Sequence, residues 1–407
     1  MEGNLKLATF YQSVGKPIGG ARIQIAAMEN PNQVIDEVYT DESGQSLDVT
    51  LPAPPLEYSM QPGAPQPYSL YDVRVQAEGF EDVEIKGVQV LPQQQALQNV
   101  MLLPKTISQR QGLVIPPHTL NGVFPPKIPE SPVKELPPVT GLVVLPEPVI
   151  PEYIVVHAGV PTNTAAPKYW VPFKEYIKNV ASSEIYATWP DETLKANILA
   201  ILSFTLNRVF TEWYRGKGYN FTITNSTQFD QAFTYGRNIF ADISRVVDEI
   251  FVNYITMPHI RQPLFAQYCD GRRVQCPGWM SQWGAKDLGD RGYTAMDIVK
   301  HYYGQEAYLA QAKKVEGVPM SWAGETLQVG SKGESVRVIQ EQLNAISNNF
   351  PAIQKLKVDG LYGENTRQSV EKFQGLFNMS TTGMVDMATW YRISSIYVAV
   401  QNLAALT

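Results

Sequence analysis

The segment between residues 105 and 151 most constrains what this chain of 407 residues can fold into. It carries eleven prolines from Pro116 to Pro151, many of them in the run "PPHTLNGVFPPKIPESPVKELPPV". Because proline has a fixed φ and no backbone N–H, such a segment favours extended conformations and cannot join a sheet interior. We therefore expect a linker at 105–151 that separates the chain into parts, in line with roughly 100–200 residues per domain.

Residues 1–104 carry the pattern of short β-strands. Runs such as "ARIQIAA" and "YDVRVQAEGFEDVEIKGVQV" alternate apolar and polar residues, are rich in Val, Ile and Tyr, and are separated by glycine-containing turns. Period-two alternation of this kind is typical of strands with one buried face. We therefore expect a small β-sandwich in this part of the chain.

The part after the linker is mainly helical in pattern. Apolar spacing predicts helices at 172–187, 191–214, 236–255 and 294–303, with strands at "YIVVHAG" and "NFTITN", so that 152–322 is expected to be mixed α/β. Two further apolar stripes predict a three-helix unit at 323–407. These stripes are Val336, Ile339, Leu343 and Ile346, and Val370, Phe373 and Phe377. The predicted fold class is therefore multidomain α+β.

Composition and charge limit the classes of partner that the chain is expected to bind. The chain is 44% hydrophobic and 18% charged, as folded proteins are, and its formal net charge of −6 gives no reason to expect a nucleic-acid or anionic-lipid partner. No run approaches the roughly 18 apolar residues of a spanning helix, and the N-terminus lacks a basic start followed by an apolar stretch. We expect neither a nucleic-acid partner nor a membrane anchor.

One acidic residue breaks an apolar stripe. In the helix expected at 172–187, Phe173, Ile177 and Val180 share one face, and the next position of that face is Glu184. A carboxyl group on an apolar face loses hydration, which raises its pKa and lets it hold a proton near neutral pH. Glu184 is thus a candidate general acid, and the alternative is an internal ion pair with Lys195 or Arg208.

The C-terminal unit resembles a known wall-binding module. Its "VDGLYGENTRQSVEKFQ" and "TTGMVDMATW" are similar to the peptidoglycan-binding type 1 domain, and the match covers nearly the whole unit. The resemblance implies that this unit, residues 323–407, binds peptidoglycan. Balanced acidic and basic residues in the unit suit a sugar or peptide ligand better than a polyanion.

Residues 152–322 resemble the SpoIID/LytB family of sporulation and amidase-enhancer proteins. Three blocks occur in the order of that family: "VASSEIYATWPDETLKANILA", "ITNSTQFDQAF" and "PGWMSQWGAKDLGDRGYTAMDIVKHYYG". The resemblance implies that Glu184 is the catalytic acid of a lytic transglycosylase. Such an enzyme needs one carboxyl group, whereas a hydrolase needs a second one, about 5 Å or 6.5–9.5 Å away. Asp191, Glu192 and Asp230 are the candidates for that second carboxylate.

Other polar residues of the same blocks are expected to support Glu184 or to bind the glycan. Hydrogen-bonding and stacking groups suit a sugar strand, and the alternative is a structural polar network beneath the cleft. The predicted supporting residues are Lys195, Gln228, Asp230, Gln231, Ser281, Gln282 and Trp283.

The two cysteines leave three possibilities open. Cys269 and Cys276 lie seven residues apart around an Asp-Gly turn, which fits a local disulfide, two metal ligands or two reduced thiols. Some relatives carry a zinc site built from His and Cys, and His259 would be the third ligand here. The spacing fits no compact zinc motif, so our prediction is that the protein has no metal cofactor.

The whole arrangement resembles the spore cortex-lytic enzymes of clostridia. This resemblance implies a proenzyme located in the cortex or coat region of the spore, outside the spore core, which cleaves cortex peptidoglycan during germination. It further implies activation by a subtilisin-like Csp protease that cuts near Val149 and Ile150. The alternatives are an N-acetylmuramoyl-L-alanine amidase and a non-catalytic protein that binds the wall or stimulates an amidase.

Overall fold

The computed structural model describes the chain except for residues 12–13, 106–110, 137–146, 321 and 405–407. Its strands are β1 (Glu2–Tyr11), β2 (Arg22–Ala27), β3 (Val34–Tyr39), β4 (Val49–Pro52), β5 (Ser69–Gln76), β6 (Val83–Val90), β7 (Gln95–Leu102), β8 (Gln111–Val114), β9 (Tyr153–His157), β10 (Lys168–Pro172), β11 (Ile223–Thr224), β12 (Ile239–Phe240), β13 (Asn253–Thr256), β14 (Tyr268–Cys269), β15 (Met280–Ser281) and β16 (Tyr308–Gln311). Its α-helices are α1 (Glu57–Met60), α2 (Phe173–Glu184), α3 (Asp191–Phe210), α4 (Ala241–Ile250), α5 (Gln282–Asp290), α6 (Ala295–Tyr303), α7 (Glu334–Ile346), α8 (Glu364–Leu376) and α9 (Met387–Ala404). The expected combination of helices and strands is confirmed. Among the described residues, no helix combines the length and the apolar character of a membrane span.

Two sheets form the N-terminal part of the molecule. One has the strand order β3-β2-β5-β6-β8, and the other has the order β12-β7-β1-β4. Alternating residues such as Leu5 and Leu7 of β1, and Val73 and Val75 of β5, are buried in a common core. The last strand of the second sheet, β12, comes from the middle of the chain, so this sheet joins two parts that the proline-rich segment separates in sequence.

The proline-rich segment is attached to the rest of the molecule. Its strand β8 pairs in parallel with β6 at the edge of the first sheet, where one side of the strand needs no partner. From there the chain crosses to the middle part, where backbone groups of Thr119, Ile128 and Lys134 are hydrogen-bonded. Described residues of this segment are therefore hydrogen-bonded to the molecule at several points, and the role of 105–151 as a linker between domains stays a prediction.

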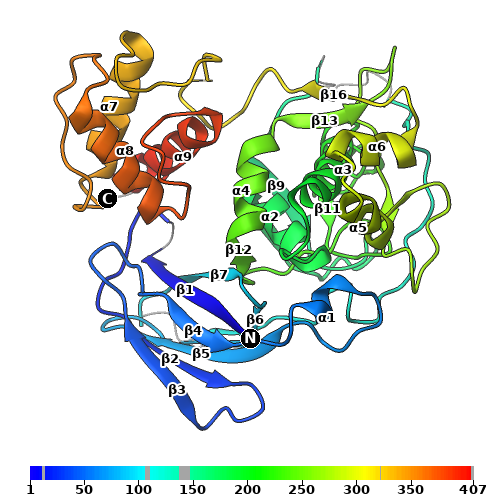
Figure 1. Cartoon of the computed structure of the whole chain (residues 1–407), viewed down its shortest axis with the longest axis horizontal. Helices are drawn as coiled ribbons and strands as arrows, with labels where there is room; N and C mark the ends of the chain where they lie inside the picture. The colour runs from blue at the N-terminus through cyan, green and yellow to red at the C-terminus, as the bar shows by residue number, and fades with distance from the viewer. Residues whose placement is uncertain (12–13, 106–110, 137–146, 321, 405–407) are drawn as a thin grey trace.

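Helices around α3 form the middle part, drawn in green and yellow in Figure 1. Helix α3 contacts α2, α4, α5 and α6 and strand β13, and its side chains are buried on nearly every face, polar ones such as Asn207 included. The helices predicted at 172–187, 191–214, 236–255 and 294–303 correspond to α2, α3, α4 and α6, with shorter bounds. Helix α5 was not predicted, because "QWGAKDLGD" contains two glycines and few apolar residues.

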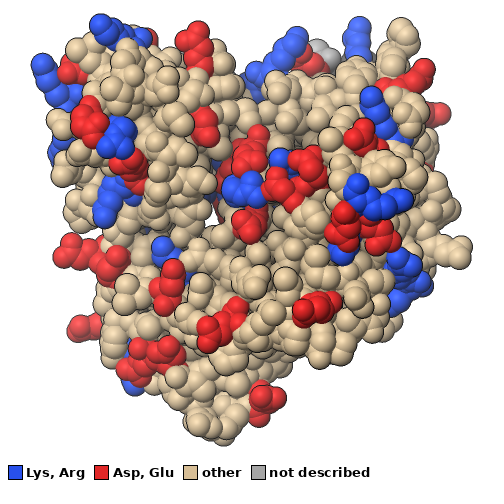
Figure 2. Space-filling view, viewed as in Figure 1, with Lys and Arg blue, Asp and Glu red and all other residues tan. Residues whose placement is uncertain are grey.

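Helices α7, α8 and α9 form the C-terminal part, which lies beside α4 and above β1 in Figure 1. Val336, Ile339 and Phe373 are fully buried among these helices, as their spacing predicted. Arg392 of α9 donates to Glu175 of α2, so the C-terminal helices also contact the middle part. Figure 2 shows acidic and basic side chains interspersed over the visible face, with a mixed cluster over α4 and a notch at the top between the two lobes.

Candidate active site

Glu184 is the last residue of α2 and lies inside the molecule. Phe173, Ile177 and Val180 of the same helix face are buried, and Glu184 is only 3% exposed. The helix ends there because Ile185 is extended, with φ of −137°, and the chain turns into α3. The inward position expected from the apolar stripe is therefore observed.

Two hydrogen bonds hold the carboxyl group of Glu184. The backbone N–H of Ala232 donates to Oε1 at 2.7 Å, and the hydroxyl group of Tyr268 donates to Oε2 at 2.5 Å. The alternative ion pairs are not formed, because Lys195 pairs with Asp191 and Glu192, and Arg208 pairs with Glu130 and Asp230.

The surroundings raise the pKa of Glu184. Burial is the largest cause, because a carboxylate in the protein interior loses its hydration. The positive charge of Lys127 and the hydrogen bonds from Ala232 and Tyr268 act in the opposite direction, but burial outweighs them. A carboxyl group with a raised pKa is the kind that can donate a proton near neutral pH.

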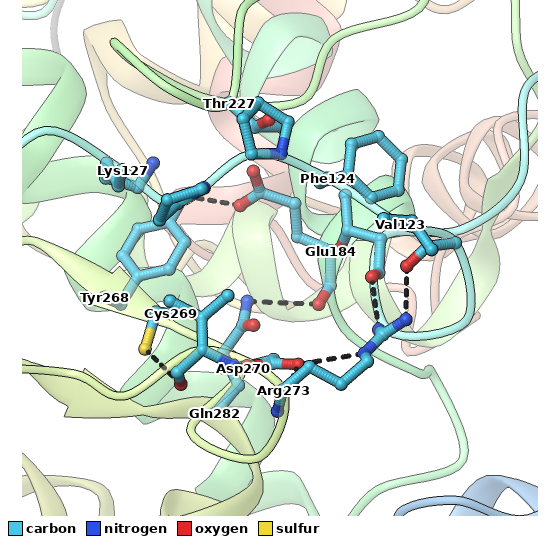
Figure 3. Close-up of a pocket in the computed structure, with 15 residues that line it drawn as sticks. Val123, Phe124, Lys127, Glu184, Thr227, Tyr268, Cys269, Asp270, Arg273 and Gln282 are labelled. Atoms are coloured by element: carbon cyan, nitrogen blue, oxygen red, sulfur yellow. Dashed lines mark hydrogen bonds and ion pairs between the residues drawn. The ribbon is translucent and has the colours of Figure 1, made fainter.

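A cavity of about 210 Å³ lies beside Glu184. Its lining comes from the proline-rich segment, from the chain around the disulfide, and from α2 and α5. The lining residues are Thr119, Gly122, Val123, Phe124, Pro125, Pro126, Lys127, Glu184, Thr227, Tyr268, Cys269, Asp270, Arg273, Val274 and Gln282. Figure 3 shows Glu184 in the middle, with Tyr268 on one side and Val123 and Phe124 on the other.

Lys127 of the proline-rich segment enters this cavity. Its Nζ donates to the backbone oxygen of Asp230 and lies 5.0 Å from the ring centroid of Tyr268 and 5.1 Å from that of Phe204. Burial lowers the pKa of Lys127, and the charges of Glu184 and Asp230 partly offset this effect. A lysine next to a candidate catalytic acid is a feature that the sequence did not reveal.

Gln231 supports Tyr268 from behind. Its Nε2 donates to the Tyr268 hydroxyl at 3.1 Å, and its Oε1 accepts from Tyr176 at 3.0 Å and from Thr205 at 2.8 Å. Gln282 lines the cavity and donates to the backbone oxygen of Glu184 at 3.1 Å. Gln231 therefore contacts the hydrogen-bond donor of Glu184, and Gln282 contacts Glu184 itself; the supporting roles expected for both stay predictions.

Asp230 is part of a buried charge network. The side chain is fully buried, Oδ1 accepts from Nε of Arg208 at 2.8 Å, and Oδ2 accepts from Tyr214 at 2.6 Å and from Thr224. Arg208 also forms two hydrogen bonds to Glu130 of the proline-rich segment. Since protein donors occupy both of its oxygens and it does not line the cavity, Asp230 is poorly placed to activate a water molecule.

Asp191 and Glu192, the other candidates for a second carboxylate, lie at the start of α3. Asp191 pairs with Lys195 and Arg245, and Glu192 accepts from the backbone N–H of Ala295 at 2.7 Å. Neither they nor Lys195 line the cavity that contains Glu184. Asp270 is the carboxylate that shares this lining with Glu184, and it accepts from backbone N–H groups of Arg272, Arg273 and Val274.

The remaining predicted residues lie outside the cavity lining. Trp283 is buried 5.0 Å from the ring of Trp189, so it is a core residue and offers no open stacking face to a glycan. Ser281 caps α5 by accepting from the N–H of Gly284. Gln228 is half-buried, and its backbone oxygen accepts from Ile128.

The two cysteines form a disulfide between Cys269 and Cys276, which is one of the three alternatives left open by the sequence. The cysteines therefore cannot act as the two thiolate ligands of a zinc site unless the disulfide is reduced. His259, the proposed third ligand, is exposed. Among the described residues, no three His, Cys, Asp or Glu side chains come together as a metal site would require.

The expected activation site lies within a tightly packed stretch. Val149 is 8% exposed and Ile150 is 1% exposed. Ile150 forms a parallel bridge with Val315, in which its N–H donates to Lys314 and its oxygen accepts from the N–H of Glu316. The chain before this site, residues 137–146, lies outside the described residues.

Comparisons with known proteins agree with two of the sequence resemblances. Residues 163–249 match the family model described as stage II sporulation protein, and residues 332–393 match the one described as putative peptidoglycan binding domain. The first match contains Glu184 and the first two sequence blocks, and the third block lies beyond it. No curated protein matches the chain.

Solved structures give weaker likenesses. The N-terminal domain of SleB is 25% identical, with 18% of this chain and 93% of that chain covered and a TM-score of 0.16. Catechol 1,2-dioxygenase from Acinetobacter sp. ADP1, inhibited by bound mercury, is 15% identical over 28% of this chain and 58% of that chain, with a TM-score of 0.18. At these TM-scores the likenesses carry no argument, and the identification rests on the two family models. This chain therefore carries a stage II sporulation protein domain together with a putative peptidoglycan-binding domain.

Proposed function

We propose that the protein is the zymogen of a spore cortex-lytic enzyme that cleaves the glycan strands of peptidoglycan. Its parts would be a β-sandwich prodomain at residues 1–104, a catalytic domain at 152–322 and a three-helix wall-binding domain at 323–407. The observation that carries the proposal is Glu184, a buried carboxyl group with a raised pKa beside a cavity, within the stage II sporulation protein domain. The putative peptidoglycan-binding domain supports peptidoglycan as the partner.

The proposed reaction is that of a lytic transglycosylase. Glu184 would donate its proton to the glycosidic oxygen, and the C1–O bond would break. The C6 hydroxyl of the same muramic acid would then close on C1 and return a proton to Glu184, which leaves a 1,6-anhydro end. One carboxyl group serves both steps, and this fits a cavity in which Asp270, the other lining carboxylate, is held by backbone N–H groups.

Proteolysis near Val149 and Ile150 by a subtilisin-like protease would activate the enzyme at the spore cortex during germination. This part of the proposal rests on the resemblance to clostridial SleC-like enzymes. It is also consistent with the proline-rich segment, which lines much of the cavity in the uncut chain.

The test is mass spectrometry of products from cortex peptidoglycan digested with the cut protein. We expect 1,6-anhydro-muramic ends, and we expect Glu184→Gln to lower their rate of formation by about 10²–10⁴-fold, the usual contribution of a general acid. Glu249→Gln, which makes the same change at an exposed residue of α4, is the matched control. Reducing ends would indicate a hydrolase, freed stem peptides an amidase, and no products a wall-binding or amidase-enhancing protein.

A further inference from the structure

The proline-rich segment lies along the surface of the middle part and is hydrogen-bonded to it. The N–H of Ile128 donates to Gln228, the N–H of Glu130 donates to the side chain of Gln267, and the N–H of Lys134 donates to the side chain of Gln262. Gln267 and Gln262 in turn donate to the backbone oxygens of Ile128 and Lys134. The segment is therefore held through backbone groups of Ile128, Glu130 and Lys134.

The first part of this contact meets the candidate active site, and the rest is anchored beside it. Arg273 donates to the backbone oxygens of Thr119 and Gly122, and all three residues line the cavity. Glu130 forms a bidentate pair with the buried Arg208. Lys127, between these anchors, places its ammonium group against the rings of Phe204 and Tyr268.

On the basis of the function proposed above, we infer that residues 119–134 are a built-in competitive inhibitor that occupies the glycan groove, with Lys127 beside Glu184. The segment excludes the sugar chain from the carboxyl group that would protonate it. The charge of Lys127 also favours the carboxylate form of Glu184, the form that has no proton to give. Arg273, Gln262 and Gln267, which hold the segment, become free for the substrate when it leaves.

A cut near Val149 would therefore not be enough by itself to expose Glu184. Val149 lies 15 residues beyond Lys134 (149 − 134), so a cut there leaves the inhibitory segment intact. The N-terminal part also stays attached through the pairing of β7 with β12 and through hydrogen bonds between Gln89 and Asn238. After the cut, the segment must therefore still be displaced by peptidoglycan or released.

The first test uses the uncut full chain and digestion of cortex peptidoglycan. We expect Lys127→Ala to release products at least about 10-fold faster than wild type, and Lys127→Met, which keeps the bulk without the charge, to lie between the two. Lys105→Ala, at an exposed lysine before the segment, should behave like wild type. If folded Lys127 variants stay as slow as uncut wild type while cut wild type is active, the inference is wrong.

The second test does not depend on the reaction. Hydrogen–deuterium exchange of the peptides that cover 119–134 should show protected amides in the uncut and in the cut protein, because the hydrogen bonds are the same in both. Adding soluble glycan strands prepared from cortex peptidoglycan to cut Glu184→Gln protein should remove that protection. If the amides of 119–134 stay protected at saturating glycan, the segment does not compete with glycan and the inference is wrong. A cut wild-type protein that yields no products overturns the proposed function instead.

Discussion

Replacing Asp230 by Asn should destabilise the middle part of the molecule and should not act through the chemistry of cleavage. The substitution keeps the size of the side chain and removes its charge. Oδ1 accepts from Arg208, and Oδ2 accepts from Tyr214 and from two groups of Thr224, so the new NH₂ group faces a donor at either position. At least one hydrogen bond is lost, and the charge of Arg208 loses one of its two counterions.

The magnitude follows from burial. Breaking a fully buried ion pair by removing one partner costs about 3–5 kcal/mol. Because Glu130 still neutralises Arg208, we expect the lower end, about 3 kcal/mol. With an m-value of about 2 kcal/mol per M urea, the unfolding midpoint should fall by about 1.5 M.

The assay must report on this part of a multidomain chain. Hydrogen–deuterium exchange of the peptides around 222–232, measured at increasing urea concentration, gives a local midpoint. Asp287→Asn is the matched control, because Asp287 pairs with Arg272 at the surface, and its midpoint should move by less than about 0.3 M. The reasoning is refuted if Asp230→Asn moves the midpoint as little as the control does. Loss of products at unchanged stability would instead give Asp230 a chemical role.

Four further predictions concern the same region. Product formation by the cut protein should decline as pH rises through the raised pKa of Glu184. Tyr268→Phe removes a hydrogen bond that lowers this pKa, so it should move the decline to higher pH. Tyr293→Phe, at an exposed tyrosine, is the control. Because the folded state raises the pKa of Glu184, the stability contributed by its protonated form is lost as pH rises from the unfolded pKa of about 4.3 through the folded pKa. Glu184→Gln does not titrate, so its free energy of unfolding should rise relative to that of wild type over this pH range. Urea midpoints measured at several pH values would show this. Asp270→Asn should lower the rate without changing the kind of product, and a switch in the product ends would show that Asp270 acts as a second carboxylate. Thiol titration of the unfolded, unreduced protein should find no free thiol at Cys269 or Cys276. Elemental analysis should find no stoichiometric zinc. Two free thiols together with bound zinc would contradict both expectations.

Local patterns predicted helix α2 of the site but not α5, and contacts distant in sequence decided the rest. The burial of Glu184 followed from one helical stripe, which needs only neighbouring residues. Lys127 reaches the cavity only because β8 and the following chain dock on the middle part, and no local pattern encodes that docking. Apolar spacing likewise could not show that Trp283 faces the core near Trp189 and away from a groove.

Few sequence patterns indicated the groups that complete the site. Tyr268 precedes Cys269 in "QYCDGRRVQC", and no pattern in that stretch marks the tyrosine as a partner of Glu184. Asp191 and Glu192 looked equivalent to Asp230 as second carboxylates, because the sequence does not show which basic group or N–H each one meets. The proline-rich composition correctly excluded a sheet interior but could not exclude an edge strand or docking on a neighbouring surface.

The packing of Val149 and Ile150 bears on when the proposed cut can occur. A protease binds its substrate as an exposed, extended strand, whereas Ile150 is held on both sides of its peptide unit by the chain around Val315. The bond becomes accessible only in the fraction of molecules in which this bridge has opened, and the cutting rate scales with that fraction when closing is faster than cleavage. Warming, or a substitution that weakens the bridge, would then speed the cut by the same protease. The stability of this bridge in the zymogen would then partly determine when activation occurs.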